Sequence, residues 1–156
     1  MILLILIFAL TALVGLARFG RNGEVSTAQR WIVGLPTGLL AGWLTAASVV
    51  GFNDTLVRED VIGSDVVAAL VGAGLLVVGA VVAALVLGVS TGGPVQASIA
   101  YAVAVLWGLF GIAANQYDSS VITTLACVVC FVTLVVVLIH TLGGSRSGWP
   151  SRARVV

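Results

Sequence analysis

The chain has 156 residues, of which 60% are hydrophobic and only 8% are charged, whereas charged residues make up about a quarter of a soluble domain. Seven arginines and six acids leave a net charge of +1, so the sequence offers no basic surface for binding nucleic acid. The composition excludes an ordinary soluble domain and indicates that the main partner of the chain is the lipid bilayer.

Five apolar segments predict the fold class, an all-α polytopic membrane protein built as a bundle of five transmembrane helices. Polar or glycine-rich residues separate the segments and predict the connecting loops. The five predicted helices cover residues 2–17, 31–51, 66–89, 95–114 and 120–142. Together they form one transmembrane domain over residues 1–143, and a basic tail over residues 144–156 follows it.

The first apolar segment begins directly after Met1, and its nearest basic residues, Arg18 and Arg21, come after it. A secretory signal has the opposite arrangement, with a basic region ahead of the apolar one, so we predict a helix that the protein retains. Because the apolar run starts so abruptly, we also expect the chain to be the C-terminal portion of a longer protein with further N-terminal helices.

The second apolar segment carries no charge and has one face almost free of side chains. Small residues spaced four apart let a neighbouring helix approach closely, so this face is predicted to pack against another helix. Pro36 lacks a backbone N–H and collides with the preceding turn, which predicts a kink near the start of the helix. The helix-packing residues are Gly34, Gly38, Gly42 and Ala46, and the fourth segment adds a similar row with Ala104 and Gly108.

Arginines near the helix ends predict the orientation, because loops on the cytoplasmic side carry the excess of basic residues. Three arginines lie between residues 18 and 30 and three lie in the tail, whereas residues 52–65 form a predicted loop with four acids and one arginine. We therefore expect a multi-pass protein of the inner cell membrane. Its tail is predicted to be cytoplasmic, with the N-terminus and the acidic loop outside.

The candidate ligand-binding residues surround two tryptophans, Trp43 and Trp107, which are predicted in the middle of their helices. Membrane tryptophans usually gather at headgroup level, and a buried indole N–H needs an acceptor. Thr45 and Tyr101 are predicted at a similar depth and Ala47 beside Trp43, so all five residues are candidates. The alternative, that both rings pack in the core or face lipid, stays open.

Catalytic and metal sites are not predicted. The helices contain no acidic or basic residue apart from His140 at the end of the fifth, whereas ion-coupled transporters carry such groups within the membrane. A nucleophile with an activating base is also missing, so we predict that the protein is not an enzyme. Cys127 and Cys130 lie in an apolar run without the four ligands that zinc needs, and buried thiols usually act as small apolar side chains.

Two runs of the chain resemble a known family. The first is LPTGLLAGWLTAAS at residues 35–48, and the second is YAVAVLWGLFGIAA at residues 101–114. Both resemble the C-terminal half of tryptophan-rich sensory proteins, which are relatives of TspO and of the peripheral benzodiazepine receptor. The family continues Trp43 and Ala47 with an asparagine, where this chain has Gly51 and places Asn53 two residues later. The family's proline- and tryptophan-rich early helices also have no counterpart in this sequence, so the resemblance leaves two alternatives open, a C-terminal fragment and a reduced relative.

The resemblance implies a membrane sensor or receptor-like protein that binds an apolar ligand between its helices. The ligands it implies are porphyrins or haem-like tetrapyrroles, sterols and isoprenoids, and no cofactor is certain. The resemblance does not by itself transfer a catalytic activity. A function of a different class stays open beside it. In that alternative the chain is a structural or assembly subunit whose glycine stripes dock partner helices, including those of a second copy in a homo-oligomer.

Overall fold

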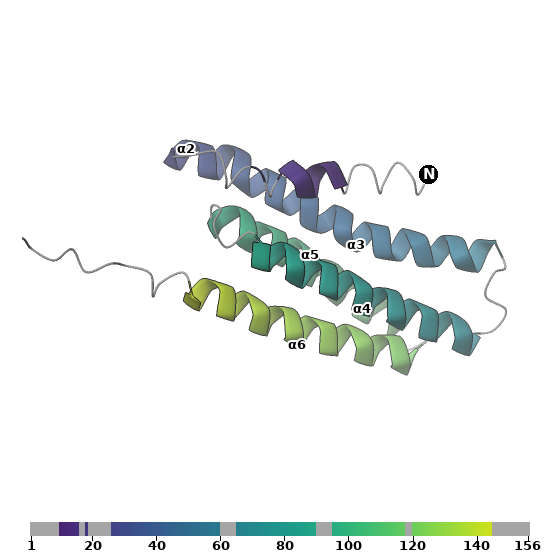
Figure 1. Ribbon diagram of the computed structural model, residues 1–156. Helices are drawn as coiled ribbons and strands as arrows, with labels where there is room; N and C mark the ends of the chain where they lie inside the picture. Colours follow the sequence, from purple (N-terminus) through teal and green to yellow (C-terminus); the bar gives the residue numbers. More distant parts are fainter. Residues whose placement is uncertain are drawn as a thin grey trace, which may run out of the picture.

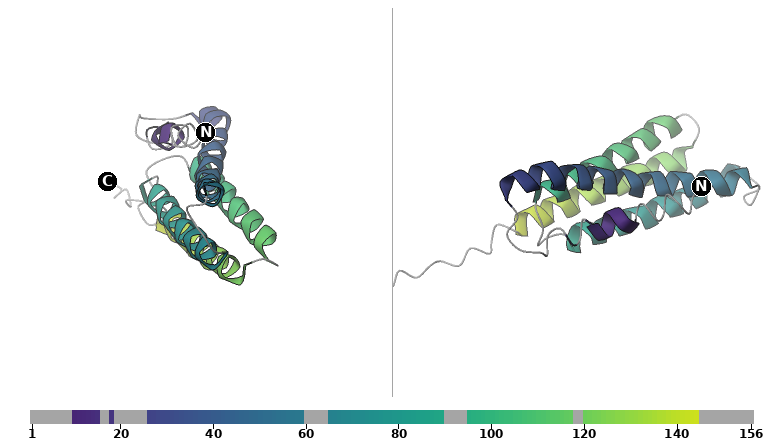
Figure 2. Two further views of the ribbon diagram at one scale, coloured as in Figure 1. Left: turned by 90° about the vertical axis from the view of Figure 1, so that its right-hand side faces the viewer. Right: turned by 90° about the horizontal axis from the view of Figure 1, so that it is seen from above.

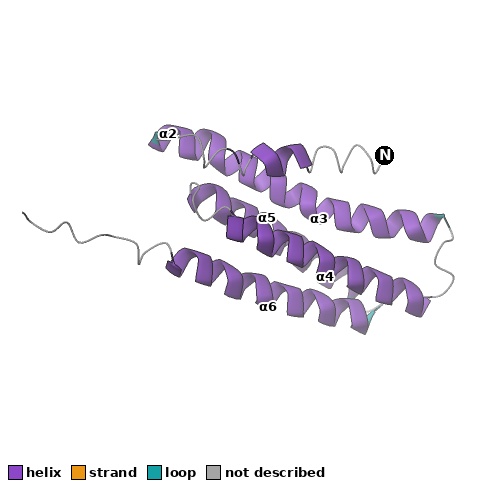
Figure 3. Ribbon diagram, in the orientation of Figure 1, coloured by secondary structure: helices purple, strands orange, loops and turns teal. Residues whose placement is uncertain are grey.

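The computed structural model describes residues 10–15, 18, 26–59, 65–89, 95–117 and 120–144 (Figure 1). Long helices dominate these residues and run side by side as a bundle (Figures 1 and 2). The described ranges contain no strand, in agreement with the predicted all-α class (Figure 3). Their elements are α2 (Thr27–Gln29), the π-helix η1 (Arg30–Gly34), α3 (Leu35–Arg58), α4 (Asp65–Val89), α5 (Val95–Gln116) and α6 (Val121–Gly144).

Four helices within the described residues are long and apolar enough to cross a membrane. The first predicted span, residues 2–17, lies outside the described residues except for residues 10–15, which are helical. The tail over residues 145–156 also lies outside them. The chain is therefore a multi-pass membrane protein, and the four helices are Thr27–Arg58, Val66–Val89, Val95–Gln116 and Val121–Gly143.

Each long helix packs mainly against two neighbours, which closes a ring in the order α3, α5, α6, α4. α3 and α5 run parallel, because their contacts advance in the same direction along both helices. Gly38 of α3 meets Ala97 of α5, and further along Ala46 meets Gly108. In the right-hand view of Figure 2, α5 starts beside α3 and moves away from it toward its C-terminal end. The core of the ring includes Leu76, Ala83, Leu87, Tyr101, Val105, Leu109, Cys127, Cys130 and Leu134.

The first long helix is continuous through α2, η1 and α3. Ser26 caps its start, because its hydroxyl accepts from the Gln29 N–H while the Gln29 side chain accepts from the Ser26 N–H. Pro36 lies in the first turn of α3, directly after the π-helical residues Arg30–Gly34. A proline ring collides with the turn before it, and the wider π turn gives it room.

α3 continues through Arg58, although the sequence predicted an end at Gly51. The Thr55 hydroxyl donates to the Gly51 carbonyl at 2.9 Å, and the Glu59 N–H donates to the Thr55 carbonyl at 2.9 Å. Residues 52–58 include no proline or glycine, so nothing in the backbone stops the helix there. The predicted acidic loop is therefore helical as far as Arg58, and the same helix begins at Thr27, four residues before the predicted start. The boundaries of the three following helices differ from the predicted ones by two residues or fewer.

The length of this helix shows how its charged end is accommodated. At 1.5 Å per residue, the 32 residues of Thr27–Arg58 extend over about 48 Å. The hydrocarbon core of a bilayer is about 30 Å thick. The helix therefore projects beyond the apolar layer, where the charged side chains near its C-terminal end meet water.

Candidate functional site

The glycine face of α3 packs directly on α5. A Cβ atom at Gly38 would overlap a backbone carbonyl of α5, and a Cβ atom at Gly42 would lie 2.8 Å from the Cβ of Ala104. Further along, a Cβ atom at Gly108 of α5 would lie 2.7 Å from that of Ala46. Ordinary van der Waals contacts begin at 3.4 Å. The two helices approach this closely only because glycine occupies these positions.

A buried hydrogen bond joins the same two helices. The hydroxyl oxygens of Thr45 and Tyr101 lie 3.3 Å apart, and the Tyr101 side chain is completely buried. The Thr45 hydroxyl donates to the Ala41 carbonyl at 2.9 Å, so Tyr101 is the donor and Thr45 the acceptor between the helices. Interhelical bonds of this kind contribute about 0.6 kcal/mol on average in membrane proteins. The pair thus fixes the register of α3 on α5.

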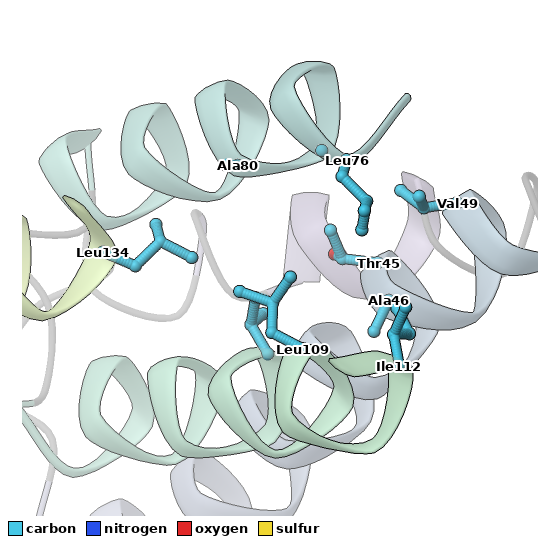
Figure 4. Close-up of a pocket in the computed structure, with 10 residues that line it drawn as sticks. Thr45, Ala46, Val49, Leu76, Ala80, Leu109, Ile112 and Leu134 are labelled. Atoms are coloured by element: carbon cyan, nitrogen blue, oxygen red, sulfur yellow. The ribbon is translucent and has the colours of Figure 1, made fainter. Parts of the chain in front are cut away.

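The centre of the ring holds a small cavity of about 20 Å³. Figure 4 shows side chains of all four long helices pointing toward this space. The space is about the size of one water molecule, but a buried water needs two or more polar partners. With Thr45 as the one polar residue among the residues that line it, the cavity is a dry packing gap. Its lining consists of Thr45, Ala46, Val49, Leu76, Gly79, Ala80, Val105, Leu109, Ile112 and Leu134.

A much larger, partly open cavity of about 1100 Å³ is lined mainly by residues of α3 and α5. It extends to the N-terminal ends of α4 and α6, and it shares Ala46, Val49, Leu76 and Ile112 with the small cavity. Ligand pockets in proteins typically measure about 300–1000 Å³. The other lining residues are Trp43, Ala47, Val50, Gly51, Asn53, Asp54, Val57 and Arg58 of α3, Ala68, Ala69 and Gly72 of α4, Trp107, Gly108, Gly111, Asn115 and Gln116 of α5, and Ser120 and Thr123 at the start of α6.

The large cavity reaches the lipid-facing surface between α3 and α5. Trp43 and Trp107 line it with 55% and 66% of their surface exposed, and the ring of Phe110 packs beside Trp107 at a centroid distance of 5.8 Å. On the inner side its walls include the buried side chains of Leu76 and Thr123. The cavity therefore connects the surrounding lipid with the interior of the bundle.

Polar groups gather at one end of this cavity, where α3 and α5 end and α4 and α6 begin. The Asn53 side-chain oxygen is buried and has no hydrogen-bond partner among the described residues. A Cβ atom at Gly72 would lie 3.3 Å from it, so the glycine leaves room for the amide against α4. We call this end the polar mouth, and it comprises Asn53, Asp54, Arg58, Asn115, Gln116, Ser120 and Thr123.

The structure divides the predicted ligand-binding residues into two groups. Trp43, Ala47 and Trp107 line the large cavity. Thr45 and Tyr101 instead bond to each other between the helices, so their hydroxyls serve this contact and not an indole. Among the predicted packing residues, Gly34, Gly38, Gly42 and Ala104 are buried, and Ala46 and Gly108 also line the large cavity.

Sequence reasoning missed the polar mouth. Asn53, Asp54 and Arg58 were expected in a loop, and Asn115 and Gln116 just beyond the end of a helix. The sequence does contain a pattern that points to this cluster. Polar residues follow the apolar segments 31–51 and 95–114, and the C-terminal ends of both segments are predicted on the same side of the membrane. This pattern says nothing about which helices are neighbours.

The two cysteines and the histidine do not line either cavity. Cys127 and Cys130 are buried in the core, and His140 is exposed near the C-terminal end of α6. Within the ranges that the structure describes, no group of three or more His, Cys, Asp or Glu residues is placed to hold a metal ion. The residues around the large cavity thus provide apolar contact, aromatic surface, hydrogen bonds and two charges.

A comparison with protein-family models relates the chain to known proteins. A model described as TSPO-like protein matches residues 1–140, which is most of the chain. A search of curated proteins and a search of solved structures found no match. The matched residues include both runs that resemble the tryptophan-rich sensory proteins. They also include the helical bundle except for the last residues of α6. The chain therefore belongs to the TSPO-like protein family.

Proposed function

We propose that the protein is a receptor-like membrane protein that binds an apolar or tetrapyrrole-like small molecule in the large cavity. The observation that carries this proposal is the cavity itself, in which α3 and α5 bring Trp43 and Trp107 to one space. Indole rings offer a broad apolar surface to a ligand. The volume of about 1100 Å³ is sufficient for a molecule of drug size or somewhat larger.

The competing hypothesis, a structural or assembly subunit, relies on a glycine stripe that is free to dock partner helices. In the structure Gly38 and Gly42 of this stripe contact α5 of the same chain, so this surface is already occupied. The large cavity, in contrast, is open toward lipid. These contacts favour the ligand-binding function, and we assign no catalytic step to the site.

The proposal includes an orientation in the inner cell membrane, with the polar mouth outside. Arg30 lies at the start of the first long helix, and α6 ends at the same end of the bundle (Figure 1). Three arginines follow the end of α6 in the sequence. Asp54 and Glu59 lie at the other end. Because basic residues gather on the cytoplasmic side, this distribution supports a cytoplasmic tail.

Porphyrin binding to the purified protein in detergent tests the proposed site. Protoporphyrin IX should quench the tryptophan fluorescence saturably, and Trp43→Phe and Trp107→Phe should each remove part of the quenched signal. Trp31→Phe is a matched control, since Trp31 is also 55% exposed but lies in η1 and does not line the cavity. Equal loss of quenching in the Trp31 and Trp43 variants would show that porphyrin associates with the protein surface.

A second variant tests the site without removing a fluorophore. Ala47→Leu adds three carbon atoms to the wall of the cavity and should weaken porphyrin binding several-fold. Val103→Leu adds one carbon atom at an exposed position of α5 that does not line the cavity, and it should bind as the wild type does. Wild-type affinity in Ala47→Leu would place the ligand elsewhere.

A further inference from the structure

The large cavity has two chemically different ends. At one end its walls are aromatic and aliphatic, and they include Trp43, Ala46 and Trp107. At the other end the polar mouth carries amides, hydroxyls and two charged side chains. Polar groups covered by a purely apolar molecule would lose water without replacement, which costs free energy. A ligand that suits both ends is therefore an amphiphile with one polar end.

The cavity is also elongated. Its lining residues on α3 run from Trp43 to Arg58, and at 1.5 Å per residue this stretch covers about 22 Å of helix. That length is a large part of the hydrocarbon core of a bilayer, which is about 30 Å thick. An extended acyl chain spans such a distance, whereas a flat ring system occupies only a part of it.

Two side chains of opposite charge lie in the polar mouth, Arg58 and, one helical turn before it, Asp54. The Arg58 guanidinium has five N–H donors at the end of a long stem and holds a carboxylate through two parallel hydrogen bonds. The Asp54 carboxylate has a much shorter side chain. The amide N–H and hydroxyl groups of the mouth are able to donate to an anion, whereas the unpartnered Asn53 oxygen only accepts. The reach and geometry of Arg58 therefore favour a ligand with an anionic end.

We propose that the large cavity holds a long-chain fatty acid, with its carboxylate on Arg58 and its chain extending toward Trp43 and Trp107. This inference rests on the proposed function, because it names the ligand class of the same cavity. Arg58 then determines specificity for the acid. Asp54 repels the carboxylate and limits that preference.

The test compares a fluorescent fatty acid, cis-parinaric acid, with its methyl ester, which has the same chain and no charge. Energy transfer from tryptophan measures binding to the full chain in detergent at alkaline pH, where the free acid is ionised. The wild type should bind the acid about five to ten times more tightly than the ester, because only the acid forms charged hydrogen bonds with Arg58. Arg58→Gln should abolish this ratio and leave the ester affinity unchanged, and Asp54→Asn should increase it.

Equal affinities for acid and ester in the wild type would overturn the inference, as would a ratio that neither variant changes. Stearic acid should displace the probe far better than octanoic acid, and equal displacement would refute the argument from length. If protoporphyrin IX binds but neither parinaric probe does, the fatty acid is wrong while the proposed function stands. If none of the three binds, the proposed function fails as well.

Discussion

Replacing Gly42 with alanine should destabilise the protein, although the same change is favourable in most helices. The new methyl group would lie 2.8 Å from the Cβ of Ala104 and overlap the carbonyl group of Tyr101. In a soluble helix, alanine is better than glycine by about 1 kcal/mol. A loss of stability would therefore report the contact between α3 and α5 and not the helix propensity of the residue.

The magnitude follows from the separation that the methyl group requires. The 2.8 Å distance to Ala104 must increase to at least 3.4 Å to become an ordinary contact. Because Ala104 has no rotatable side chain, the helices themselves must move apart. A gap of about 0.5–1 Å forfeits a quarter to a half of each neighbouring dispersion contact, and overpacking of this kind costs about 1–3 kcal/mol. We expect Gly42→Ala to lower the free energy of unfolding by that amount.

The matched control is Gly74→Ala in α4, because Gly74 is exposed and a Cβ atom there would meet nothing within 4 Å. Titration with SDS in mixed micelles, followed by circular dichroism, gives the free energy of unfolding of each protein. Gly74→Ala should not lower it by more than about 0.5 kcal/mol. If Gly42→Ala proves as stable as Gly74→Ala, the two helices are not in close contact, and the reasoning from glycine packing is refuted.

Three further predictions concern the helix contact, the packing gap and the orientation. Tyr101→Phe should lower the free energy of unfolding in the same titration by about 0.6 kcal/mol, the average for an interhelical hydrogen bond, and an unchanged value would mean that the bond to Thr45 does not stabilise the fold. Val105→Ile adds a methyl group beside the small cavity and should raise the free energy of unfolding by up to about 0.8 kcal/mol, whereas Val103→Ile at an exposed position should leave it unchanged. A loss of stability in Val105→Ile would show that the gap is too narrow for a methyl group. Glu59→Cys should react with a membrane-impermeant maleimide in intact cells, and Ser26→Cys only after the membrane is opened, because these exposed residues flank the first long helix at opposite ends. The reverse labelling pattern would contradict the proposed orientation.

The described membrane helices could be predicted because a single apolar segment in lipid satisfies its backbone hydrogen bonds by forming a helix. Peptide groups in hydrocarbon must bond within their own segment, so the apolar runs at residues 66–89 and 95–114 are helical despite their many valines and glycines. The end of α3 could not be predicted in this way. The charges of residues 52–58 indicate where the apolar layer ends, but a helix can continue into water, and α3 does so as far as Arg58.

The candidate site could be predicted only in part. The positions of Trp43 and Trp107 in mid-helix indicate residues of interest, but periodicity within one helix cannot show that α3 and α5 are parallel neighbours. That arrangement decides that Thr45 bonds to Tyr101. It also decides that Arg58 lies in the same mouth as the polar end of α5. Both contacts depend on tertiary packing, which no local pattern reports.

The parallel pairing of α3 with α5 also determines when the bundle can assemble during synthesis. α3 leaves the ribosome first, and all of α4 must follow before α5 emerges. Until then the partner that the structure gives to the glycine face of α3 is missing, and lipid tails give helices little reason to associate. We therefore expect nascent chains that stop before Val95 to be rapidly degraded, and the decisive folding step to come after α5 enters the membrane.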